Sequence, residues 1–221
     1  MFKGLLTGIL SLVLLASGAA AVNTLAGYSG TPGNAPQMRP ATLFQGDLIA
    51  EMGLGCSNGV GTSGGPNDVV QGVAAASAPP FNITGHFYYI YTQVSPTITA
   101  LSFIVHTGMA MPGAEIGRVG GLDWSMGSHT VPISPHVPVP TAFLFFGHNQ
   151  PQSNVGMRWG LDTSTGGAGT SYIRAPACGA TVFTLIDQLG FPGNWVMSVT
   201  INDDVVPVEL QSWGSTKAMF R

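Results

Sequence analysis

An alternating segment near the C-terminal end most constrains the fold of this chain. Between residues 194 and 202, apolar side chains occupy the odd-numbered positions and polar ones the even-numbered positions, interrupted only by Val196. A period of two is the pattern of a β-strand with one buried face. Cys178, one of two cysteines, lies just upstream. The segment therefore predicts a core strand that follows closely on a cross-link.

Similar apolar runs recur along the chain, separated by short turns rich in Gly, Pro, Asn and Asp. We expect strands at residues 42–52, 82–92, 97–107, 115–120, 128–133, 142–148, 155–162, 195–202 and 205–211, and a short helical turn within 182–189. Amphipathic helices of 10–15 residues are not seen between them. The fold class predicted is all-β: an antiparallel, jelly-roll-like β-sandwich of about nine or ten strands with at most one short helix. A closed barrel is the alternative.

Two stretches look irregular in this pattern. Residues 53–80 are rich in glycine and include an alanine run, so we expect a long irregular segment that borders a sheet edge. Pro135, Pro138 and Pro140 follow the predicted strand at 128–133. Because proline has no backbone N–H, this stretch is expected at a sheet edge or in a loop.

The N-terminal residues have the order of parts of a signal peptide. Lys3 precedes an apolar stretch, and three alanines at 19–21 supply the small residues for cleavage. We predict a signal peptide at 1–21, a weakly ordered leader at 22–41 and a single β-sandwich domain at 42–221. The mature protein is expected to be secreted, extracellular or periplasmic, with no membrane segment.

Charged residues make up only 8% of the chain, against about 25% in a typical domain, and the formal net charge is −3. The seven Lys and Arg residues are scattered, so nucleic acid and anionic membranes are poor partners. A polysaccharide or another surface protein is the expected partner. In an exported protein, two cysteines predict a disulfide, here Cys56–Cys178.

Two glycine-rich motifs resemble serine-hydrolase signatures. Gly61-Thr-Ser-Gly-Gly-Pro66 differs by one residue from a serine-protease motif, but all five histidines follow Ser63, which is the wrong chain order. Gly55-Cys-Ser-Asn-Gly59 matches a nucleophile-elbow pattern, yet no helix is predicted after it. We interpret both as loops and predict no catalytic residue.

Metal-binding patterns are weak. Asp162, Asp203 and Asp204 lie at predicted turns and are candidates for a structural calcium ion, because oxygen-rich loops suffice for Ca²⁺. His106, Met109 and Met111 are similar to the His/Met clusters of exported copper proteins, but we interpret them as a strand end followed by a Met-Pro-Gly turn. No cofactor is expected beyond a possible structural calcium.

The aromatic residues of the strand at 82–92 alternate between its two faces. Phe87, Tyr89 and Tyr91 share one face and Tyr88 lies on the other, so one set must leave the core unless both faces are covered. An exposed row of aromatic rings could stack on sugar rings. We take Tyr88 and Trp124 as candidate ligand-binding residues, with packing inside the sandwich as the alternative.

Several short motifs together resemble the exported β-sandwich proteins of bacteria with large secretomes. They are Phe81-Asn-Ile-Thr-Gly, Met111-Pro-Gly-Ala-Glu115, Met157-Arg-Trp-Gly-Leu-Asp162, Ala175-Pro-Ala-Cys-Gly179 and Gly190-Phe-Pro-Gly-Asn-Trp195. The resemblance covers residues 42–202 and implies a jelly-roll-like fold without a known catalytic set.

The resulting functional hypothesis is a secreted, non-enzymatic β-sandwich that acts in extracellular binding or adhesion, with carbohydrate as the first ligand class. A structural or assembly protein of the cell surface or matrix is the alternative, and a secreted hydrolase is the third.

Overall fold

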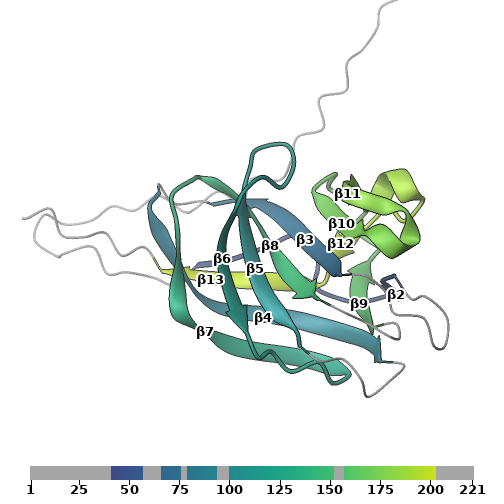
Figure 1. Ribbon diagram of the computed structural model, residues 1–221, viewed down its shortest axis with the longest axis horizontal. Coiled ribbons are helices and arrows are strands. Elements are labelled where there is room, and N and C mark those ends of the chain that lie inside the picture. The colour runs from purple at the N-terminus through teal and green to yellow at the C-terminus, as the bar shows by residue number, and fades with distance from the viewer. Residues whose placement is uncertain (1–40, 57–65, 76–78, 94–99, 152–156, 203–221) are drawn as a thin grey trace, which may run out of the picture. The chain divides into compact units, whose positions relative to one another are not determined.

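The computed structural model describes residues 41–56, 66–75, 79–93, 100–151 and 157–202. Within these ranges the chain is all-β, with thirteen strands and two short 3₁₀-helices. The strands form two antiparallel sheets that pack face to face as a β-sandwich (Figure 1). The predicted fold class is confirmed, although the strands are more numerous than expected.

The first sheet has seven strands: β1 (Ala41–Phe44), β2 (Met52–Leu54), β4 (Phe81–Gln93), β7 (Gly127–Val139), β9 (Met157–Asp162), β12 (Asn194–Trp195) and β13 (Met197–Asn202). The second has six: β3 (Asn67–Ala74), β5 (Ser102–Thr107), β6 (Glu115–Gly120), β8 (Phe143–Gln150), β10 (Ser171–Ala175) and β11 (Ala180–Leu185), in the order β11-β10-β3-β8-β5-β6. The 3₁₀-helices η1 (Pro176–Cys178) and η2 (Ile186–Leu189) flank β11.

The strand pairing has jelly-roll connectivity. β2 pairs with β9, β3 with β8, β4 with β7 and β5 with β6, all antiparallel. These four pairs are nested like the two arms of one long hairpin, and successive pairs alternate between the two sheets. A hairpin rolled up in this way is the jelly roll. β10 and β11 extend the second sheet beyond β3, whereas β13 and β1 extend the first beside β4.

The core lies between the two sheets and contains most of the large apolar side chains. Trp159, Trp195, Phe103 and Phe146 are fully buried there. The alternation at 194–202 is confirmed, since its odd-numbered side chains all belong to this core. A second, smaller cluster of Val70, Ile104, Phe145 and Tyr172 covers part of the outer face of the second sheet.

The expectation of an irregular segment at 53–80 is wrong for its central part. Residues Asn67–Ala74 form β3, which lies between β8 and β10. Seven of its eight residues are buried, because the core covers one face and the smaller outer cluster covers part of the other. A strand covered on both faces does not alternate, so no period of two marks it in the sequence.

Two further segments differ in detail from the sequence pattern. β11 runs to Leu185, and only residues 186–189 form a helical turn, which is a 3₁₀-helix. β7 continues through Pro135 and Pro138. Among the described strands it pairs only with β4, so it is an edge strand of the described sheet, as the prolines predict. The predicted signal peptide, nearly all of the leader and the strand at 205–211 lie outside the described residues. No helix in the described part of the chain has the length and apolarity to span a membrane.

Candidate functional site

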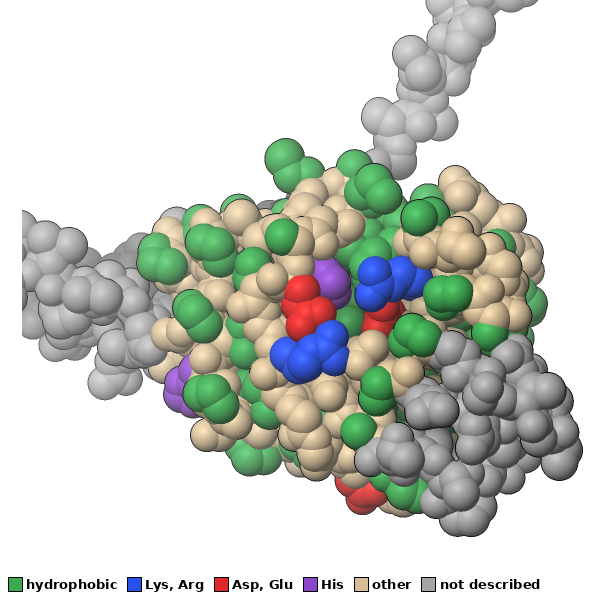
Figure 2. Space-filling view, viewed as in Figure 1, with side chains coloured by type: hydrophobic (Ala, Val, Ile, Leu, Met, Phe, Trp, Pro, Cys, Tyr) green, Lys and Arg blue, Asp and Glu red, His purple; other side chains and the backbone are tan. Residues whose placement is uncertain are grey.

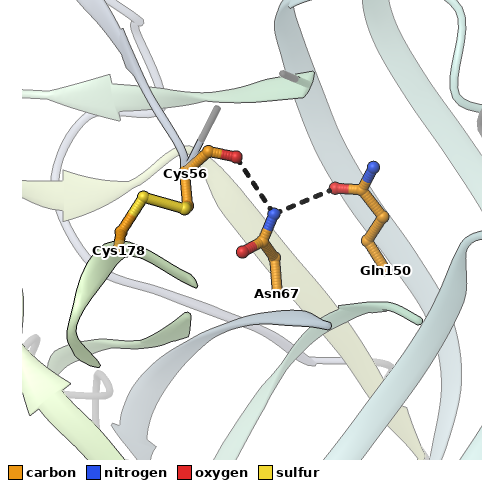
Figure 3. Close-up of a disulfide and its surroundings, with 4 residues drawn as sticks. All are labelled: Cys56, Asn67, Gln150 and Cys178. Carbon is orange, nitrogen blue, oxygen red and sulfur yellow. Dashed lines mark hydrogen bonds between the residues drawn. A yellow bond between two sulfur atoms is a disulfide. The ribbon is translucent and has the colours of Figure 1, made fainter. Parts of the chain in front are cut away.

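The predicted disulfide is confirmed. Cys56, which follows β2, is bonded to Cys178 in η1, with 5.9 Å between their Cα atoms (Figure 3). The buried side chain of Asn67 donates from Nδ2 to the carbonyl oxygen of Cys56 (3.2 Å) and to Oε1 of Gln150 (3.4 Å). Hydrogen bonds therefore connect the disulfide to the first residue of β3 and, through it, to the last residue of β8.

Tyr88 lies in the core, which corrects the expectation that its ring could stack on a sugar. Its ring stacks between those of His86 and His129, and its hydroxyl donates to the carbonyl oxygen of Asp123 (2.6 Å). Burial, with a smaller contribution from the Asp123 carboxylate, raises the pKa of Tyr88. Trp124 is half-buried and packs against the core. Tyr88 therefore offers no free ring face to a ligand, whereas ligand binding at Trp124 stays a prediction.

The other aromatic set of β4 faces outward. Phe87, Tyr89 and Tyr91 lie on the outer face of the first sheet, because the pleat sends their side chains opposite to Tyr88 and Ile90. Phe87 and Tyr89 are partly exposed and Tyr91 is 38% exposed. The rings of Tyr89 and Tyr91 are neighbours, with centroids 6.5 Å apart. The sequence identified this row but not its orientation.

Two glycines on neighbouring strands support these tyrosine rings. A Cβ at Gly53 would lie 2.5 Å from Cδ1 of Tyr91, and one at Gly160 would lie 2.9 Å from Cδ1 of Tyr89. The rings therefore occupy space that side chains on β2 and β9 would otherwise fill. Packing against the sheet limits their rotation, so the rings are held in place before any ligand arrives.

Phe44 extends this surface across the sheet. The register places Phe44 opposite Ser198 and Ser198 opposite Phe87, so all three side chains point to the same side. Phe44 is 43% exposed. We call Phe44, Phe87, Tyr89 and Tyr91 the aromatic face. Hydroxyl groups lie beside it, including that of the exposed Thr130 opposite Phe87 on β7.

Asp162, the described member of the calcium candidates, organises a loop. Its carboxylate oxygens accept hydrogen bonds from the backbone N–H of Asp47, from the backbone and hydroxyl of Ser164, and from the backbone and hydroxyl of Thr165. Burial alone would raise the pKa of Asp162, but these hydrogen bonds outweigh it and the pKa is lowered. The loop is therefore built around an ionised carboxylate.

Three carboxylates meet at this loop. Oxygen atoms of Asp47, Glu51 and Asp162 lie within 4.8 Å of one another. The hydrogen bonds already use the lone pairs of Asp162 that a cation would need, and Glu51 accepts one from the backbone of Thr163 (2.7 Å). Calcium binding at Asp162 stays a prediction, and Asp203 and Asp204 lie outside the described residues.

The residues considered for copper are only partly brought together. His106, which is buried, and Met111 both line one pocket, whereas Met109 is 87% exposed on the turn. The residues Ser57–Gly65, which carry most of both hydrolase-like motifs, lie outside the described residues. The structure therefore adds no geometry to either motif.

A pair of buried histidines was not singled out by the sequence. Nδ1 of His86 lies 2.8 Å from the carbonyl oxygen of Ser198 and must donate to it, so Nε2 of His86 is an acceptor. Nε2 of His148, 3.0 Å away, is therefore the donor, and both rings are neutral. Burial lowers the pKa of His86 to about 3 and the pKa of His148 well below its usual value.

The chain was also compared with known proteins. No protein-family model, no curated protein and no solved structure matches it significantly. Functional inference therefore rests on the side chains and surfaces of this fold.

Proposed function

We propose that this protein binds polysaccharide on the aromatic face. The observation that supports this most directly is the alignment of Phe87, Tyr89 and Tyr91 along one strand, with their side chains partly exposed on the outer face of the first sheet. Residues 87 to 91 cover about 13 Å at the usual rise of a strand. This length suits a stretch of a chain-like ligand better than a single sugar ring.

The chemistry of the surface fits such a ligand. A sugar ring has C–H groups on its faces and hydroxyl groups around its rim, so it matches aromatic rings with hydrogen-bonding groups beside them. Tyrosine presents a large rigid surface at low entropic cost and adds a hydroxyl group. Phe44 and Tyr91 are the most exposed rings, and hydroxyl groups such as that of Thr130 lie alongside.

The proposed location is outside the cell, and the proposed role is non-enzymatic. The Cys56–Cys178 disulfide supports export, because such bonds persist in oxidising compartments. The signal-peptide pattern at 1–21 points the same way. Binding is favoured over hydrolysis because the aromatic face consists of phenyl and phenol rings on an outer sheet face, which suit stacking on a sugar.

The alternative is an assembly protein that pairs through a sheet edge. The edge strand β7 supports this alternative less well than the aromatic face supports ligand binding. This edge strand of thirteen residues contains Pro132, Pro135 and Pro138. Each proline removes an N–H that an incoming strand would need, which is one way in which proteins protect an edge.

Removing one ring tests the proposal. We expect the full chain to bind at least one of cellulose, chitin, xylan or an α-glucan in pull-down assays, and Tyr91→Ala to weaken that binding about five- to tenfold, as expected for a lost aromatic contact of about 1 kcal/mol. Phe191→Ala is the matched control, since Phe191 is also 38% exposed but lies outside the aromatic face. Failure to bind any of these polysaccharides, or equal loss in both variants, would refute the proposal.

A further inference from the structure

Charged side chains gather around one hollow on the outer face of the second sheet. Figure 2 shows acidic, basic and histidine side chains together there, on a surface with few other charges. The hollow is a pocket of about 420 Å³. One wall is the loop between β5 and β6, and the other is the hairpin of β10 and β11. Its lining includes His106, Met111, Glu115, Arg174, Val182 and Phe183. We call it the Arg174 pocket.

A buried polar pair on β3 and β8 connects the two walls. Nδ2 of Asn149 donates to Oδ1 of Asp68 (2.5 Å), and Asp68 is fully buried. Oδ1 of Asn149 accepts from Nη1 of Arg118 on β6 (2.6 Å). Arg118 in turn binds both oxygens of Glu115, each at 2.8 Å. This hydrogen bond lowers the pKa of Glu115, so the acid is ionised and its charge is compensated.

Arg174 on β10 is held by the same network with one edge left open. Its Nε donates to Oδ2 of Asp68 (2.6 Å), and its Nη2 also contacts that oxygen. The guanidinium lies over the ring of Phe183, 4.9 Å from the centroid. Nη1 makes no hydrogen bond to the residues that the structure describes, and the side chain is 40% exposed. A planar cation is thus fixed on one edge by the protein and presents its other edge to the pocket.

His106 supplies an unused acceptor beside it. Its Nδ1 lies 3.0 Å from the carbonyl oxygen of Gly113 and must donate to it, so in the neutral ring Nε2 carries a lone pair. Nε2 is buried and has no hydrogen-bond partner among the described residues. The ring meets Phe183 edge to face, with centroids 5.2 Å apart. His106 and Arg174 therefore lie around the same phenyl ring.

From this arrangement we propose that the Arg174 pocket binds a small ligand that carries a carboxylate close to a hydroxyl group. The carboxylate pairs with the open edge of Arg174, whose planar fork matches two carboxylate oxygens. The hydroxyl donates to Nε2 of His106, and the ligand body lies against Phe183. A sugar acid and a short hydroxy acid both have this chemistry. The proposal is independent of the aromatic face, which belongs to the other sheet.

Calorimetric titration of the full chain tests the ligand chemistry. Glucuronate represents the sugar acids and lactate the hydroxy acids. Glucose lacks the carboxylate, and propionate lacks the hydroxyl group. We expect at least one acid to bind, and its matched analogue to bind at least about tenfold more weakly. The acid that binds identifies the source of the ligand. If neither acid binds at 10 mM, or if the matched analogue of the acid that binds does so equally well, the proposal is overturned.

Variants at an exposed position locate the site without threatening the fold. Val182 is 64% exposed and lines the pocket. Val182→Asp is expected to weaken acid binding about tenfold by charge repulsion, whereas the uncharged Val182→Asn is expected to leave it within about twofold. Arg174→Gln is expected to abolish binding, and Tyr91→Ala to leave it unchanged. Equal affinities of Val182→Asp and Val182→Asn would place the ligand elsewhere.

Discussion

Lowering the pH from 7 to 5 is expected to reduce the free energy of unfolding by about 4 kcal/mol. His86 and His148 are neutral and buried in the native state, and burial lowers the pKa of His86 from 6.5 to about 3. In the unfolded chain both titrate near 6.5, so the unfolded state takes up protons first. Below about pH 6.5, each histidine that is protonated only in the unfolded chain lowers the free energy of unfolding by about 1.4 kcal/mol per pH unit. At pH 5 this amounts to about 2 kcal/mol per histidine.

The direction of the pH dependence of stability follows from these pKa shifts. Because the folded pKa values of both histidines lie below the unfolded ones, the contribution to stability is complete above about pH 6.5 and is lost as the pH falls toward the folded pKa values, the one for His86 being about 3. Domains have about 5–15 kcal/mol of total stability, so acid unfolding well before pH 3 is expected. Denaturant titrations at pH 7, 6 and 5, followed by fluorescence of the buried Trp159 and Trp195, measure the change.

A variant assigns this effect to the histidine pair. His148→Gln keeps an N–H donor for Nε2 of His86 but removes one titrating ring, so the stability difference between pH 7 and pH 5 is expected to shrink by about 2 kcal/mol. His136→Gln, at an exposed position, is the control and should leave the difference unchanged. A wild-type pH dependence in His148→Gln would show that the buried pair is not its cause.

Loss of the disulfide is expected to have an effect of similar size. The bond joins residues 122 positions apart, so it restricts a long loop in the unfolded chain. On the chain-entropy model, replacing both cysteines by alanine costs about 4–5 kcal/mol. Guanidinium unfolding of the Cys56→Ala/Cys178→Ala variant measures the loss, and reductant should shift the midpoint of the wild type but not of the variant. A variant within about 1 kcal/mol of the wild type would contradict this expectation.

The sequence predicted strands where apolar and polar residues alternate, and it did not predict β10 or β11 as strands. Alternation at 195–202 and 157–162 matches β13 and β9 closely. β3 was missed because both of its faces are covered, which removes the alternation. The disulfide was predictable because the chain contains only two cysteines, which allow one pairing.

The orientation of β4 is a feature that the local sequence pattern could not predict. Both faces of this strand carry aromatic residues, so alternation separates Tyr88 from Tyr89 and Tyr91 without showing which set is buried. The answer depends on the second sheet, whose His148 and Phe103 pack with His86 beside Tyr88. These partners are distant in the chain, and no local pattern reports on them.

The Arg174 pocket likewise depends on contacts between segments that are distant in the sequence. Asp68, Arg118, Asn149 and Arg174 come from β3, β6, β8 and β10, and pairs that touch are separated by 31 to 106 residues. Composition and alternation were sufficient for the all-β class and for most of the strands, because both depend on neighbours a few residues away. Strand pairing between remote segments was needed to join these four polar side chains in one hydrogen-bonded network and to turn one row of aromatic rings outward.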